Sequence, residues 1–254
     1  MKIGRGAMDG QPAVAAAPGA VPDGLPPGSR IETGALPAAG ELLRIPADQP
    51  GELLSTLVDW AAGSGPASAP VVIELYGGLV VWTPQRAAVA APAGRVEKAT
   101  GAVCEFAATA AELAAIEREV AAAWQDYETD LPAGFTGSSD SRRVLELEAR
   151  YRRSMSLAGR LSRLSPRIHL PAEHPPTLAG QFGERLRDRC RLADREEFID
   201  DQLEAIIRLY ETCAQRTSDR LLAHREYVLI WVIVLLLAAE MVLLLVDLLA
   251  AAGG

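Results

Sequence analysis

Residues 227–239 read Tyr-Val-Leu-Ile-Trp-Val-Ile-Val-Leu-Leu-Leu-Ala-Ala and contain no charged side chain. Apolar residues continue to Ala252, interrupted only by Glu240 and Asp247. An α-helix needs roughly 20 predominantly apolar residues to cross the hydrocarbon layer of a bilayer, so this stretch is long enough. A buried core helix is the alternative, but such a helix is rarely apolar on all sides when the other helices of the chain have two distinct faces. We therefore predict a transmembrane helix over residues 227–252.

The two acids within this segment bear on how it sits in the membrane. An Asp or Glu at the centre of a span costs about 2.5 to 3.5 kcal/mol, whereas each Leu, Ile, Val or Phe contributes about 0.3 to 0.6 kcal/mol. The many large apolar residues therefore outweigh both acids. Glu240 and Asp247 are seven positions apart and share one helix face. Either this face packs against other helices of an oligomer, or both acids are tolerated in a protonated or interfacial position.

The residues that flank the segment predict its orientation. Arg216, Arg220 and Arg225 precede it, and no Lys or Arg follows it. Under the positive-inside rule, most of the chain then stays in the cytoplasm (or in the matrix of an organelle), and the segment is a single-pass tail anchor. The chain has 23 Arg and only two Lys, which is typical of a GC-rich genome. We therefore expect a bacterial inner-membrane protein.

The charge distribution and the cysteines indicate where the rest of the chain is located. Residues 1–141 carry a net charge of −9, whereas residues 142–225 carry +4. The three cysteines Cys104, Cys190 and Cys213 are too few for a disulfide framework, and Cys190 and Cys213 are expected on one helix. Reduced, buried thiols are consistent with a cytoplasmic body. The N-terminus lacks the apolar region of a secretory signal.

The first half of the chain predicts an α+β fold. Residues 1–40 are rich in Ala, Gly and Pro and are expected to be disordered. Residues 41–109 are expected to form a small α+β domain, with a strand at 41–45, a helix at 51–62 and a strand at 101–107. Residues 71–76 and 79–83 are rich in β-formers and are joined by Gly77-Gly78, which predicts a hairpin; a single bent strand is the alternative.

Residues 110–226 predict a helical domain. One amphipathic helix ends before Pro132, a second is capped by Asp140 and stops at Pro166, and a third begins near Leu178 or Gly183. No helix breaker follows before the apolar segment, so one helix from Glu196 to Leu249 is expected to serve as stalk and anchor. A coiled-coil-like stripe with 4-3-4-3 spacing is expected to associate the stalks of a homo-oligomer, through Ile199, Leu203, Ile206, Tyr210 and Cys213.

Motifs for catalysis are not found. The sequence has no Gly-rich phosphate loop, no Gly-x-Ser-x-Gly and no His-Glu-x-x-His, so we expect no cofactor and no enzymatic activity. His169, Glu173 and His174 could ligate a metal, which leaves an uncharacterised metal-dependent enzyme as an alternative. The excess of arginines on the second helix has three possible partners. Pairing with acids of the same chain is favoured, contact with lipid headgroups comes second, and binding of RNA is the least favoured. These arginines include Arg142, Arg143, Arg150, Arg152 and Arg153.

Two stretches are similar to the YagE family, whose eukaryotic relatives are named for meiotic nuclear division. The first is Glu74-Leu-Tyr-Gly-Gly-Leu-Val-Val-Trp82, which resembles an apolar strand of that family. The second comprises Asp194-Arg195-Glu196 through Leu209-Tyr-Glu211, then Arg225-Glu226-Tyr227-Val-Leu-Ile-Trp231 and Glu240. The resemblance covers residues 70–254, but the chain is shorter than the family between Arg95 and Glu173. It implies a membrane-attached, oligomeric protein without known enzymatic activity, whose mitochondrial relatives support organellar translation.

These observations lead to one expected function. The chain is predicted to be a tail-anchored, homo-oligomeric scaffold or assembly factor whose partners are membrane lipid, further copies of itself and an unidentified protein. A membrane tether for ribosomes or RNA through the Arg-rich helices is the second hypothesis, and a metal-dependent enzyme the third. An ion pathway lined by Glu240 is a fourth.

Overall fold

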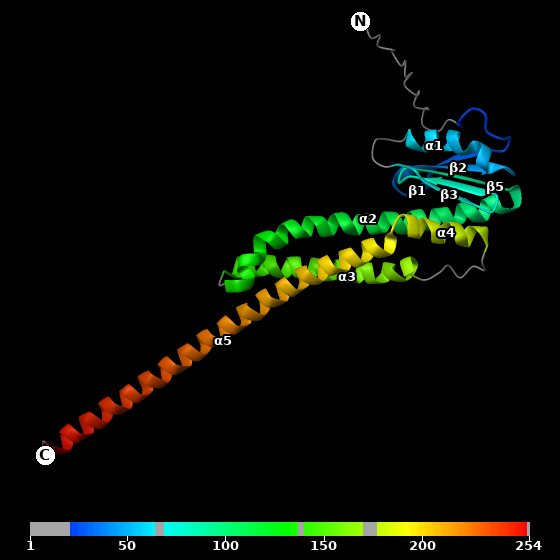
Figure 1. The fold of residues 1–254 in the computed structure, drawn as a ribbon. Coiled ribbons are helices and arrows are strands. Elements are labelled where there is room, and N and C mark those ends of the chain that lie inside the picture. The colour runs from blue at the N-terminus through cyan, green and yellow to red at the C-terminus, as the bar shows by residue number, and fades with distance from the viewer. Residues whose placement is uncertain (1–20, 64–68, 137–139, 170–176, 253–254) are drawn as a thin grey trace, which may run out of the picture. The chain divides into compact units, whose positions relative to one another are not determined.

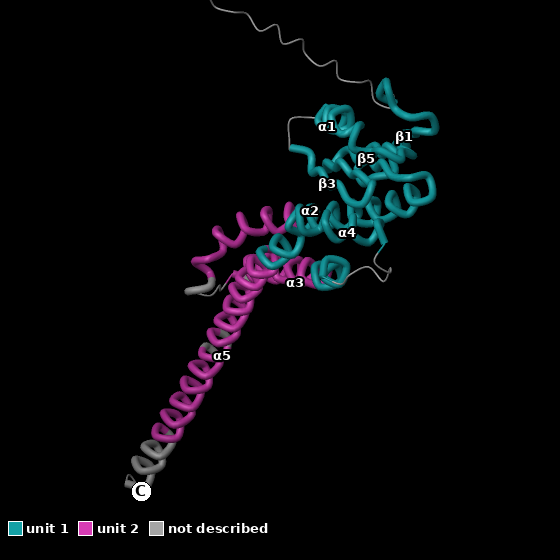
Figure 2. The backbone as a smooth tube through the Cα atoms, turned by 45° about the vertical axis from the view of Figure 1, so that its right-hand side comes forward, with its two compact units in different colours: residues 1–116, 161–198 teal, residues 117–160, 199–254 magenta. Residues whose placement is uncertain are grey.

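The computed structural model describes residues 21–63, 69–136, 140–169 and 177–252. It confirms an N-terminal sheet followed by a mostly helical region (Figure 1). The chain divides into two compact units, residues 1–116 with 161–198 and residues 117–160 with 199–254 (Figure 2). Three long helices contribute residues to both units: α2 (Ala93–Thr136), α3 (Ser141–His169) and α5 (Leu192–Ala252).

The first unit contains a five-stranded mixed sheet with the order β1-β2-β5-β4-β3. Its strands are β1 (Arg30–Leu36), β2 (Gly40–Pro46), β3 (Val71–Leu75), β4 (Gly78–Trp82) and β5 (Arg86–Ala91). The β2–β5 pair is parallel and the other pairs are antiparallel. Helix α1 (Leu54–Ala62), which follows the 3-10 turn Pro50–Leu53, covers one face, and α2 with α4 (Leu178–Arg189) covers the other (Figure 1).

The predicted hairpin is present and brings α4 onto the sheet. Tyr76 (φ 46°) and Gly77 (φ 76°) form its turn, so the two positive φ angles of a primed turn lie one residue earlier than the Gly-Gly pair. Gly78 opens β4, where a Cβ atom would lie 2.8 Å from Cζ of Phe182 on α4. Glycine is needed at this position because the helix packs directly on the strand.

The core beneath α1 adjoins a buried ion pair. Leu43, Ile45, Leu57, Trp60 and Val81 are among its buried side chains. Arg86, the first residue of β5, lies opposite Glu41 in the parallel register, and its Nε donates to Glu41 Oε2 at 2.8 Å. Its Nη1 donates to the Trp60 carbonyl at 2.8 Å, and the guanidinium lies over the Trp60 ring. The paired charges therefore connect β2, β5 and α1.

Several sequence-based boundaries differ from the structure. Strand β1 lies within the 1–40 segment that was expected to be disordered, where it pairs with β2; residues 1–20 lie outside the described residues. The strand expected at 101–107 is part of α2, whose buried Val103 and Phe106 continue the helical spacing that leads to Leu113. The strand beside β4 is instead β5, a run of Ala and Val.

The helices extend beyond the predicted proline stops. Pro132 lies inside α2 and Pro166 inside α3, each within the last turn or so of its helix, where the loss of one backbone hydrogen bond disturbs few following residues. The predicted cap is confirmed, because the Arg142 amide donates to Asp140 Oδ1 at 3.0 Å. The start of α4 at Leu178 is also confirmed, with Thr177 as its cap.

The long helix is confirmed with slightly wider limits. Helix α5 is 61 residues long and runs without interruption from Leu192 to Ala252. Cys190 does not lie on it, contrary to expectation, because Arg191 takes a left-handed conformation (φ 52°) between α4 and α5. The three cysteines are free thiols.

Candidate functional site

Helix α5 changes character along its length. Its early residues on the predicted stripe are buried, with exposed fractions of 0 to 3% at Ile199, Leu203, Ile206, Tyr210 and Cys213. From Tyr227 to Val242 the large apolar side chains are between 47 and 73% exposed. One continuous helix therefore begins as part of a packed core and continues as an uncovered apolar rod.

Two helical regions are long and apolar enough to cross a membrane, residues 93–133 of α2 and residues 192–242 of α5. The apolar window of α2 is half buried, whereas that of α5 has no buried residue. Packing within the chain accounts for α2, because Leu113, Ile116 and Val120 are fully buried. It does not account for α5, so this helix is the candidate membrane segment.

The predicted oligomerisation stripe has a different role from the one expected. All five of its residues are buried within a single chain, in the unit formed by residues 117–160 and 199–254. The stripe is therefore an internal packing surface and is not exposed for contact between copies. Helical spacing could not distinguish the two cases, because an intramolecular bundle and a coiled coil bury the same positions.

Glu240 and Asp247 were the predicted intramembrane acids. The side chain of Glu240 is exposed on α5, between the apolar residues Leu237 and Met241. The side chain of Asp247 lies outside the described residues. Glu240 thus presents a carboxyl group on an uncovered apolar surface.

Asp130 occupies the centre of a polar network in the second unit. This α2 residue is completely buried and forms ion pairs with Arg143 and Arg150 of α3. It also accepts a hydrogen bond of 3.2 Å from the Tyr210 hydroxyl on α5. Burial and the negative charge of Asp130 raise the pKa of the Tyr210 phenol, and the hydrogen bond to Asp130 raises the pKa of Arg150. One carboxylate therefore joins three helices.

The arginines predicted to face lipid or RNA are mostly occupied. Arg143 and Arg150 bind Asp130, as described above, while Arg142 pairs with Glu146 at 3.5 Å. Arg152 pairs with Glu148 at 2.6 Å. Arg153 is exposed. This arrangement favours internal pairing of the positive excess over a surface that binds a polyanion.

The residues of the predicted metal site are not brought together in the described part of the chain. His169, at the end of α3, lies with its Nε2 2.5 Å from Oε2 of Glu196, and Glu173 and His174 lie outside the described residues. No group of three or more possible metal ligands occurs among the described residues. Burial also raises the pKa of the Cys104, Cys190 and Cys213 thiols, which disfavours the reactive thiolate at each of them.

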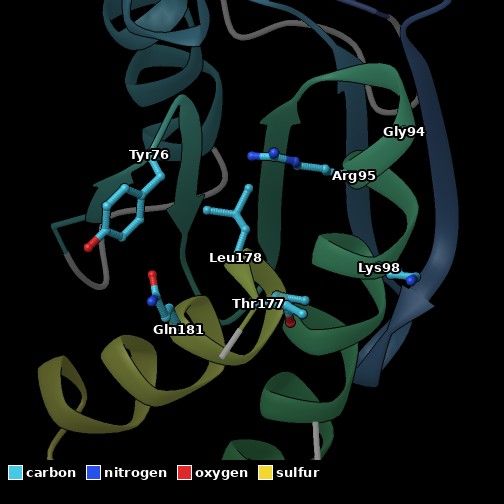
Figure 3. A pocket seen from close by; sticks show the side chains of 8 residues that line it. Tyr76, Gly94, Arg95, Lys98, Thr177, Leu178 and Gln181 are labelled. Atoms are coloured by element: carbon cyan, nitrogen blue, oxygen red, sulfur yellow. The ribbon is translucent and has the colours of Figure 1, made fainter. Parts of the chain in front are cut away.

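A pocket of about 490 Å³ in the first unit was not predicted (Figure 3). It lies between the β3–β4 turn and the first turns of α2 and α4, and its lining includes Tyr76, Arg95, Lys98, Thr177 and Gln181. Arg95 extends toward Leu178, whereas Lys98 leaves α2 on the side away from Tyr76 (Figure 3). The sequence feature that could have indicated this pocket is Pro92 followed by a helix with no acid in its first turn. At such a terminus no side chain offsets the positive end of the helix dipole.

A comparison of the chain with protein-family models, with curated proteins and with solved structures found no match.

Proposed function

We propose that this protein is anchored in a membrane by a single span, the distal part of α5, and acts as an oligomeric scaffold or assembly factor without enzymatic activity. The observation that carries the proposal is the change along α5 from a buried core helix at Ile199–Cys213 to an uncovered apolar helix from Tyr227 onward. In water, such a large contiguous apolar surface would drive association or aggregation. In a bilayer, the same surface is stabilised by lipid.

The residues at the start of the apolar segment suit a membrane interface. Arg216, Arg220 and Arg225 are exposed on the turns that precede it. Tyr227 and Trp231 contact each other edge to face, with ring centroids 6.2 Å apart. Aromatic rings gather at headgroup level and arginines remain on the cytoplasmic side, so this order supports a cytoplasmic body.

Self-association is proposed to occur within the membrane, through the helix face that carries Glu240. The stripe at Ile199–Cys213 is unavailable because it is buried within each chain. An acid in a span usually faces another helix or a wet cavity rather than lipid, and a single-span protein provides such a surface by pairing copies. A non-catalytic role is supported by the raised pKa of each thiol and by the contact with Glu196 that holds the His169 ring.

The anchor is tested by fractionation of the full-length protein, followed by extraction of the membranes with alkaline carbonate. We expect the wild type to remain with the membranes. The double variant Leu235→Arg/Leu236→Arg should be released, because two central arginines add about 5 to 7 kcal/mol to the cost of insertion.

Phe198→Arg is the matched control, since Phe198 is an exposed apolar residue at the other end of the same helix. This variant should stay with the membranes. Recovery of full-length wild type in the soluble fraction after lysis without detergent would refute the proposal. Protease treatment of sealed inverted vesicles tests the orientation, and the body should be digested from outside.

A further inference from the structure

A groove of about 310 Å³ lies between α3 and α5 within the second unit, and its lining is mostly apolar. Val144, Leu147 and Tyr151 form its α3 wall. Tyr210 and Cys213, which belong to the buried stripe, lie on its α5 side. The packing of α2, α3 and α5 within one chain therefore leaves part of this apolar surface uncovered.

The exposed edge of the α5 wall carries no charge. Ala214 and Ser218 line the groove and are exposed. Leu222 follows after a further four residues, so the three lie along one side of the helix, and Leu222 is 55% exposed. Asp219 and Arg220 occupy other sides of the same turns. An uncharged side within a charged segment is typical of a surface that another apolar group covers.

This side of α5 leads into the membrane contact proposed above. Leu222 and Glu240 are 18 residues apart, which is about five turns of an α-helix, so both point in the same direction. The helix is uninterrupted between them. The face proposed to associate copies inside the membrane therefore continues on the cytoplasmic side, through Leu222, to the groove.

We propose that α5 of a second copy covers this groove, and that Leu222 of each copy enters the membrane-side end of the groove of the other; this rests on the self-association proposed above. Copies held by the same segment share one orientation and one depth, so equivalent residues come to equal height. Helical side chains lean toward the N-terminus of their helix. Leu222 of one copy therefore reaches the level of Ser218 of the other.

The surface is self-complementary, as a two-fold interface requires. Leu222 and Leu145, which is 64% exposed beside Val144 of the groove wall, provide large apolar side chains. The small residues Ala214 and Ser218 let a second helix approach closely. Contact between two copies would thus remove from water the large apolar side chains that the single chain leaves exposed next to the groove.

A lipid acyl chain is the competing occupant. Ser218 lies nine residues before Tyr227, which is about 13 Å along the helix. Arg220 and Arg225 are exposed on the turns between them. The groove therefore lies on the cytoplasmic side of the aromatic and basic residues that mark the membrane interface, where a protein surface fits better than hydrocarbon.

The experiment is crosslinking of full-length protein in native membranes that contain two differently tagged copies. One copy carries Leu145→Cys and the other Leu222→Cys, and a short bifunctional maleimide joins thiols that lie close together. A mixed-tag dimer should form above the background given by wild-type copies with Leu222→Cys copies. Arg220→Cys in place of Leu222→Cys is the matched control and should give no mixed dimer, because position 220 lies about 200° away around the helix.

A second pair of copies separates this proposal from the membrane contact. Copies that both carry Leu236→Cys, one turn before Glu240, report contact inside the membrane when they are oxidised with iodine. If they form dimers while positions 145 and 222 give none, the groove proposal is overturned and self-association in the membrane stands. If neither pair forms dimers, both proposals fail.

Dissociation of the oligomer gives an independent measurement, by energy transfer between labelled copies in mild detergent. Leu222→Ser should raise the concentration for half-dissociation at least about tenfold, because each copy loses a buried leucine. The melting temperature of the dissociated chain should not change, since Leu222 is exposed there. Phe198→Ser, at an exposed apolar residue of α5 outside the groove, should dissociate as the wild type does.

Ala214→Trp tests the competing occupant, because the larger side chain fills the groove. It should raise the concentration for half-dissociation as Leu222→Ser does. Native mass spectrometry in the same detergent would overturn the proposal if phospholipid stays bound to the wild type and is lost from Ala214→Trp while the dissociation is unchanged.

Discussion

The hydroxyl of Tyr210 lies 3.2 Å from Oδ2 of Asp130, a carboxylate that is completely buried and placed 80 positions earlier in the chain. Arg143 and Arg150 bind the same carboxylate from α3. The contact joins α5, the helix that carries the proposed anchor, to the other two helices of its unit. Stability of this unit should therefore depend strongly on one acidic residue.

Asp130→Asn is expected to lower the free energy of unfolding by about 2 kcal/mol, since two arginines lose their charged partner while remaining partly exposed to solvent. Thermal unfolding of the detergent-solubilised protein, followed by tryptophan fluorescence, measures the change. The control is Glu148→Gln, which removes an exposed pair with Arg152 and should cost less than about 1 kcal/mol. Equal melting temperatures for the two variants would contradict this prediction.

The Tyr210 hydrogen bond should make stability depend on pH in alkaline solution. Burial and Asp130 raise the pKa of the folded Tyr210 phenol above its ordinary value of 10.0. Above pH 10 the unfolded chain loses this proton while the folded chain keeps it, so the stabilisation is present below pH 10 and is lost as the pH rises further. Tyr210→Phe should unfold more easily at neutral pH by about 1 kcal/mol and show a shallower decline above pH 10. Tyr151→Phe, at an exposed hydroxyl, is the comparison variant and should retain the wild-type decline.

Two glycine-to-alanine substitutions should have opposite effects. At Gly78 the added Cβ would lie 2.8 Å from Cζ of Phe182 and 3.0 Å from Cδ2 of Leu178, which should destabilise the protein by about 1 to 3 kcal/mol. At Gly101, inside α2, a Cβ meets nothing within 4 Å. Gly101→Ala should therefore stabilise the protein by about 0.5 to 1 kcal/mol. Denaturant unfolding checks both, and a loss of stability in Gly101→Ala would be inconsistent with the open space around that residue.

Glu240→Leu should separate anchoring from self-association. The variant should insert at least as well as the wild type, because a costly acid is removed. Loss of an interhelical hydrogen bond in the membrane is worth about 0.6 to 2 kcal/mol, so dimers or higher oligomers should dissociate at a several-fold higher concentration. Crosslinking in native membranes measures this, with Leu236→Ile as the control. An unchanged crosslinking pattern would exclude Glu240 from the contact between copies.

Local signals in the sequence were sufficient for the hairpin, the cap at Asp140, the start of α4 near Leu178 and the long α5, since each depends on neighbouring residues alone. Strand β5 was not predicted, because Arg-Ala-Ala-Val-Ala-Ala has little β-propensity. It is a strand because it lies centrally between β2 and β4, where all six of its residues are buried. Strand β1 was missed for a similar reason, since its partner β2 is what orders it.

The candidate sites also divide into those that local sequence signals identify and those that depend on tertiary packing. The apolar segment and Glu240 were identified from composition, which is a local property. The network of Asp130 with Arg143, Arg150 and Tyr210 and the pocket at Arg95 depend on which helices become neighbours, and a single sequence does not contain that information. The stripe at Ile199–Cys213 was located correctly, but its partner was another part of the same chain rather than another copy.

The continuity of α5 fixes the direction in which Glu240, the proposed intramembrane acid, points. A helix advances by about 100° per residue, so the angular position of Glu240 around the helix axis is set by the packing of Tyr210, thirty residues earlier. Inserting one residue between Ser218 and Arg225 would rotate Glu240 by about 100° relative to the buried stripe, and seven inserted residues would return it to within about 20° of its original direction. The buried stripe of this helix thereby dictates which side of the proposed membrane segment a neighbouring span would meet.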